Sequence, residues 1–186
     1  MKILFRLDAG TAPVISIDDH DYPVGSRIDL QGTDTAHGNK MYEVFGYVGA
    51  QLTKRYFALL LYMARAWSKR GTADSAVVSL SEIVKLPGWT SYVEDIRKGI
   101  DKRFEGGTDR RMKVRAGYVH FSPPSVVKFE GIDTPEADQY CKKTDDNGLG
   151  FSICYEQMMS NVVGESDVDN LRVMRRRMRD AADYIS

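Results

Sequence analysis

The chain has 186 residues, of which 42% are hydrophobic and 28% are charged, and its 26 lysines and arginines balance its 26 aspartates and glutamates. This length and apolar content exclude a wholly disordered chain and predict one domain, or one domain with an appendage. No apolar run approaches the about 18 residues that cross a bilayer, and Arg6 and Asp8 interrupt the apolar start. We therefore expect a cytoplasmic protein without a membrane span or a signal peptide.

The first fifty residues favour β-structure. Ile3–Leu7 and Pro13–Ile17 are short β-favouring runs on either side of a turn-like stretch. Arg27–Leu30 alternates with period two, a polar loop follows over 33–39, and Met41–Val48 again favours a strand. These segments predict a small antiparallel sheet.

Beyond residue 52 the apolar spacing becomes helical. The first helix has Thr53 as its N-cap and Gly71 just past its basic end. Ser79 and Glu82 form a capping box, in which hydroxyl and carboxylate satisfy free amides reciprocally, so a second helix is expected to begin there. The Pro-Gly pair at 87–88 is expected to end it.

A third helix and a basic β-hairpin follow. A second capping box, Ser91 to Glu94, opens the helix, and Gly106-Gly107 is expected to end it. The Arg111–Arg115 run, a two-residue turn and Tyr118–Ser122 predict the hairpin. The apolar stripe of the helix is Val93, Ile96, Ile100 and Phe104. A sheet, three helices and a basic hairpin, in this order, are typical of a winged helix-turn-helix.

We therefore predict an α+β fold with two parts: a winged-helix domain with an N-terminal antiparallel sheet over residues 1–125, and a C-terminal helical extension over 126–186. The extension is expected to begin a helix at Thr134 and Pro135. Its last helix, 167–184, spaces apolar residues by three and four among several arginines. That pattern suits packing onto the domain, and it also suits a homodimer through paired helices.

The neutral total hides an uneven charge distribution. Residues 53–115 hold fourteen cations against seven anions, whereas 1–52 hold four against seven and 116–186 hold eight against twelve. A compact cationic region attracts polyanions even on a neutral molecule. The alternative is that these charges form solvated helix faces.

Three segments resemble the OmpR-type winged-helix DNA-binding domains. Phe45–Leu60 is similar to the strand that leads through Leu-Thr into that family's first helix. The helix carrying Ile96 and Ile100 resembles its recognition helix, and Met112–Phe121 resembles its wing. The resemblance covers about residues 25–125. Residues 1–24 are too few for the family's receiver domain, so control by aspartate phosphorylation is not expected.

The resemblance implies a non-enzymatic transcription regulator that binds double-stranded DNA. A helix fits the major groove, where its side chains reach base edges, and a basic hairpin strand suits backbone phosphates or the minor groove. The candidate DNA-binding residues are Arg97, Lys98 and Lys102 on the third helix, Arg111, Lys113 and Arg115 on the hairpin, and Lys54 and Arg55 at the start of the first helix.

A protein-binding adaptor is the alternative function. In that case the winged helix and the last helix contact another protein, and the cations are solvated or paired with Glu94, Asp95 and Asp101. Fold alone does not decide between these functions.

No motif for catalysis, a cofactor or a metal stands out. A phosphate-binding Gly-rich loop, a CxxC pair and a Gly-x-Ser-x-Gly elbow are all missing from the sequence. The three histidines are scattered, and Cys141 and Cys154 are expected to be free, buried thiols. We therefore expect no enzyme activity, no cofactor and no metal site.

Overall fold

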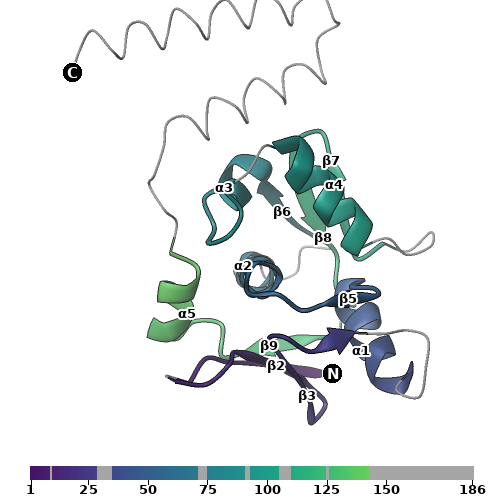
Figure 1. The fold of residues 1–186 in the computed structure, drawn as a ribbon, viewed down its shortest axis with the longest axis vertical. Helices are drawn as coiled ribbons and strands as arrows, with labels where there is room; N and C mark the ends of the chain where they lie inside the picture. Colours follow the sequence, from purple (N-terminus) through teal and green to yellow (C-terminus); the bar gives the residue numbers. More distant parts are fainter. Residues whose placement is uncertain are drawn as a thin grey trace, which may run out of the picture.

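The computed structural model describes residues 1–8, 10–28, 35–70, 75–90, 93–104, 110–124 and 126–142. Over these residues the chain has mixed α+β structure, with a four-stranded sheet, a three-stranded sheet and a short two-stranded ribbon. Helix α2 (Lys54–Ser68) passes between the two larger sheets, and α3 and α4 lie with the three-stranded sheet at one end of this part of the molecule (Figure 1).

The four-stranded sheet begins with the two strands that the sequence predicts, β1 (Lys2–Arg6) and β2 (Val14–Ile17), paired antiparallel. A third strand, β3 (His20–Pro23), is not anticipated. It follows a two-residue turn in which Asp18 and Asp19 have φ of 44° and 66°. Aspartate tolerates this left-handed conformation, so the pair can close a tight hairpin.

The fourth strand of this sheet comes from far along the chain. β9 (Lys128–Glu130) pairs parallel with β1, and α5 (Pro135–Tyr140) follows it. Thr134 is the N-cap of α5, as predicted, and its hydroxyl accepts a hydrogen bond from the Ala137 amide. Residues 126–142, expected in the C-terminal extension, therefore belong to the N-terminal sheet and its surroundings. The helix expected over 167–184, and the homodimer through it, lie outside the described residues.

The loop and strand expected over 33–48 are wrong in the described part, because α1 (Thr35–Phe45) is a helix. Met41, Val44 and Phe45 are fully buried, and their spacing of three and four is that of one helix face. Gly46 ends the helix in the left-handed region, at φ 71°. The antiparallel ribbon beside it pairs β4 (Arg27–Ile28) with β5 (Ala50–Gln51), so the expected strand at 27–30 is present at its start.

The predicted helices of the central region are present with altered limits. α2 begins after Thr53, whose hydroxyl accepts from the Tyr56 amide. α3 (Leu80–Val84) begins after Ser79, whose hydroxyl accepts from the Glu82 amide, but it ends before the Pro-Gly pair. α4 (Val93–Arg103) has the predicted apolar face, since the described members of its stripe are buried.

The predicted basic hairpin is present as β7 (Met112–Arg115) and β8 (Tyr118–Phe121). Ala116 and Gly117 close it with φ of 49° and 77°, which suits a two-residue hairpin turn. A strand that the sequence analysis missed, β6 (Ala76–Ser79), pairs with β8 and gives the sheet order β6-β8-β7.

One aromatic cluster joins the two larger sheets. Phe45 of α1 stacks on Phe121 of β8 at 5.8 Å between ring centroids, and it also contacts Phe5 of β1 and Phe129 of β9. Phe57 of α2 packs edge-to-face on Phe5 at 5.6 Å. Such ring pairs add to the free energy gained by burying apolar area. The two sheets therefore share one hydrophobic core.

Candidate nucleic-acid interface

Helix α4 is fixed against α2 through its buried face. Ile96, Ile100 and Phe104 are at most 2% exposed. The Tyr56 hydroxyl donates to the Gly99 carbonyl at 3.1 Å, and a side chain at Gly99 would meet that hydroxyl at 3.4 Å. The opposite face of α4 is thereby directed away from the core.

That outer face of α4 mixes both signs of charge. Arg97 lies 3.3 Å from Glu94 and 3.8 Å from Asp101, and Lys98 lies 3.5 Å from Glu94. The hydrogen bond from Arg97 is the largest cause that lowers the pKa of Glu94. Such exposed pairs are worth at most about 1 kcal/mol each, so a phosphate can replace them. Lys102 is exposed and has no carboxylate partner among the described residues.

The hairpin presents two unpaired cations. Lys113 and Arg115 are exposed on β7, and among the described residues neither has an ion-pair partner. Met112 and Val114, which alternate with them, face the core. Arg111 precedes the strand and differs from these two, because its Nε donates to the Glu43 carbonyl in the last turn of α1, at 3.1 Å. Of the three cations expected in a row, Lys113 and Arg115 are free on β7 within the described structure, whereas Arg111 is held by the end of α1.

The two candidates at the start of α2 have different surroundings. The Arg55 guanidinium lies over the rings of Tyr56 and Trp89, at 5.2 and 5.5 Å from their centroids. Trp89 is buried and its indole N–H donates to the Arg55 carbonyl at 2.6 Å. A side chain at Gly88 would approach Arg55 Cβ to 2.9 Å. Arg55 therefore packs on Tyr56 and Trp89, and Tyr56 is the residue that bonds to Gly99 of α4.

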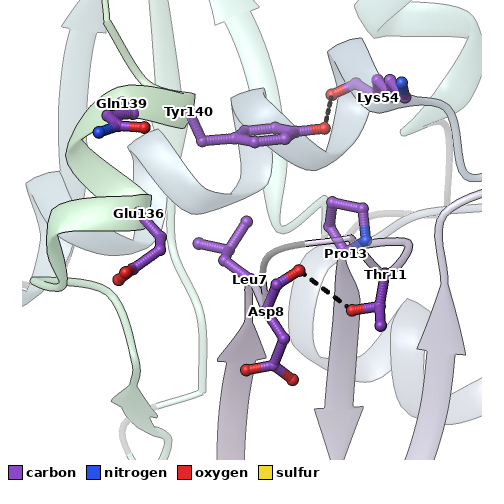
Figure 2. A pocket seen from close by; sticks show the side chains of 8 residues that line it. All are labelled: Leu7, Asp8, Thr11, Pro13, Lys54, Glu136, Gln139 and Tyr140. Carbon is purple, nitrogen blue, oxygen red and sulfur yellow. Dashed lines mark hydrogen bonds between the residues drawn. The ribbon is translucent and has the colours of Figure 1, made fainter.

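Lys54 lies instead at a hollow of about 400 Å³ between the β1–β2 turn and α5 (Figure 2). The Tyr140 hydroxyl donates to the Lys54 carbonyl at 3.4 Å, and burial raises the pKa of Tyr140 to about 12. Asp8 and Glu136 place carboxylates around the same hollow. Lys54 therefore has different surroundings from Arg55, since it lies beside α5 and not beside Trp89.

Trp89 contacts the candidate residue Arg55, and the sequence did not predict this role. Its position in the turn between α3 and α4 is visible in the sequence, but its contact with Arg55 depends on tertiary structure. By contrast, the pairing of the α4 cations with Glu94 and Asp101 was expected from the sequence as the alternative to DNA contact, and these residues have the three- and four-residue spacing of helix neighbours.

Within the described ranges no group of three or more histidine, cysteine, aspartate or glutamate side chains is placed to hold a metal ion. Cys141 is a buried free thiol at the end of α5. Burial is the largest cause that raises its pKa to about 11. This environment is that of a structural thiol, since a reactive cysteine needs a lowered pKa.

Cys141 is expected to react slowly with a disulfide reagent. In a Cys154→Ser variant, labelling at pH 8 should be about 100-fold slower in the folded protein than in urea, because the thiolate fraction falls tenfold for each pH unit below the pKa. The folded rate should keep rising with pH until about 11. Absorbance of the released thiol measures both rates, and a folded rate that levels off near pH 9 would contradict the burial argument.

No helix in the described parts of the chain has the length and apolar character needed to span a membrane. No family model, curated protein or solved structure matches this chain.

Proposed function

We propose that this chain binds double-stranded DNA as a transcription regulator, with α2, β6, α3, α4, β7 and β8 as a winged helix-turn-helix. The support is topological: the chain order of these elements, and the sheet order β6-β8-β7, are those of a winged helix. In this proposal α4 is the recognition helix in the major groove and the β7–β8 hairpin is the wing. The resemblance to OmpR-type domains leads to the same assignment.

The observation that carries the proposal is the set of unpaired cations on those elements. Lys102 on α4, and Lys113 and Arg115 on β7, are exposed without a carboxylate partner in the described structure. A free cation meets a phosphate without first breaking an ion pair, and it releases condensed counterions from DNA. Arg97, Lys98 and Arg55 would add contacts once their present partners rearrange.

The decisive experiment is the salt dependence of duplex binding. In fluorescence anisotropy with a 30-base-pair duplex, we expect Lys113→Ala with Arg115→Ala to lower the slope of log K against log salt by about 2, and to weaken binding at least about tenfold at low salt.

The matched control removes two cations from the four-stranded sheet, by Lys2→Ala with Lys128→Ala, both of which pair with Glu130. Net charge falls equally in the two double variants. An equal loss of affinity in both would show attraction by net charge alone, and no duplex binding by the wild type at 50 mM salt would exclude the proposal.

A protein-binding adaptor is a second candidate, favoured by the three carboxylates on α4. Glu94→Gln separates the two functions. If α4 contacts DNA, losing this carboxylate frees Lys98 and leaves Arg97 with Asp101, and it should tighten duplex binding about two- to fivefold, the equivalent of one exposed ion pair. Unchanged duplex affinity in the same anisotropy assay would take α4 out of the DNA interface and favour the adaptor.

A further inference from the structure

The outer face of the β6-β8-β7 sheet carries two ring side chains, Tyr118 and His120, that the duplex proposal does not use, beside two cations that it does use, Lys113 and Arg115. Strand register places Arg115, Tyr118 and Ser79 in one row across the sheet, and Lys113, His120 and Val77 in the next. The alternate residues on all three strands face the core. These two rows therefore lie on the side of the sheet away from the helices.

Two ring side chains occupy the middle strand of this face. Tyr118 is 44% exposed, and Val126 is the other exposed large hydrophobic side chain among the described residues. His120 follows two positions later and is half-buried. Residues two apart on a strand point to the same face about 6.5 to 7 Å apart, so the rings form a short line along β8.

Cations flank this line on one side and small side chains on the other. Arg115 lies opposite Tyr118, and Lys113 lies opposite His120, both on the edge strand β7. None of the six residues in the two rows is acidic. The face thus has two ring side chains along its central strand and two cations along one edge.

We propose that this face takes single-stranded nucleic acid, with bases stacked on Tyr118 and His120 and phosphates held by Lys113 and Arg115, the two cations that it shares with the proposed duplex interface. Every unpaired base has an aromatic face to stack, and such stacking is tolerant of sequence. A duplex keeps its base faces inside the helix, so an exposed ring on a sheet face offers it little. Charge complementarity with a polyanion favours this occupant over an apolar peptide.

The test compares binding of fluorescein-labelled dT20 and of a 20-base-pair duplex at one salt concentration. We expect Tyr118→Ala to weaken dT20 binding about tenfold, as for loss of one base–aromatic stack, and to leave duplex affinity unchanged. Tyr118→Phe keeps the ring and should retain dT20 affinity. His120→Ala should weaken dT20 binding further.

Lys102→Ala is the matched counterpart, since Lys102 lies on α4 and is expected to affect the duplex alone. If duplex binding is absent while dT20 binding depends on Tyr118, the duplex proposal fails and this one stands. If wild type does not bind dT20, if Tyr118→Ala binds it normally, or if that variant weakens both ligands equally, the single-strand site is excluded.

Discussion

Replacing Gly131 by alanine is expected to lower the free energy of unfolding by about 3 kcal/mol or more, the combined cost of backbone strain and of overpacking. Gly131 has φ 70°, in the left-handed region, directly after β9. A Cβ there would lie 2.2 Å from the Phe5 carbonyl oxygen and 3.3 Å from Leu4 Cδ1. The oxygen belongs to the backbone of β1, so it cannot move away as a side chain would.

The effect reaches the core because β1 is held on both edges. It pairs with β2 on one side and with β9 on the other, and Phe5 contacts Phe45 and Phe57. Relieving the clash requires β1 and β9 to separate at this point. We therefore expect a lower urea midpoint by far-ultraviolet circular dichroism, with loss of the β1–β9 pairing as the cause.

Gly25→Ala is the control for backbone strain alone. Gly25 has φ 102°, yet a Cβ there would meet nothing within 4 Å. Its substitution should cost about 1 to 2 kcal/mol, the cost of placing an L side chain in that region. Equal destabilisation by the two variants would refute the argument that the Phe5 carbonyl makes Gly131 special.

The contrast between β1 and β9 explains what the sequence can predict of this fold. β1 and β2 are adjacent β-favouring runs, so local pattern identifies them. β9 is three residues long and pairs with a strand more than a hundred positions away. β6 is similar, since it pairs with β8 across two helices. Pairing of this kind depends on the assembled core and leaves little local signal.

The error at α1 has a different physical origin. Met41–Val48 contains enough aromatic and β-branched residues to favour a strand, yet Met41, Val44 and Phe45 also have helical spacing. A short apolar run fits both periods, and tertiary packing decides between them. Here Phe45 reaches Phe121 and Phe129 only if the segment is a helix that ends at Gly46.

In the candidate site, too, local pattern predicts some features and tertiary packing decides the others. Residue type and spacing identified Lys102, Lys113 and Arg115, because their exposure follows from the helix and strand periods. Sequence could not separate Lys54 from Arg55, since neighbouring residues on α2 meet α5 in one case and Trp89 in the other. Tertiary contacts alone show that these two cations have different surroundings.

Trp89→Ala is expected to destabilise the fold by about 3 to 5 kcal/mol, the usual cost of truncating a buried tryptophan. The ring is 2% exposed and packs edge-to-face on Tyr56 at 5.1 Å, while its N–H donates to the Arg55 carbonyl. Tyr56 in turn binds α4 through Gly99. Loss of the indole should therefore loosen both α2 and α4, and urea titration followed by circular dichroism measures the change.

Trp89→Phe separates packing from function at the same position. It keeps an aromatic ring near Arg55 but removes the indole donor to the Arg55 carbonyl, and the loss of that one hydrogen bond should cost about 1 kcal/mol. If the turn between α3 and α4 fixes the position of α4 for DNA contact, this folded variant should also bind the 30-base-pair duplex more weakly. Trp67→Phe, whose ring contacts Phe129 at the other sheet, should leave duplex affinity unchanged. Equal duplex affinity in both variants would mean that Trp89 stabilises the fold without positioning α4 for DNA.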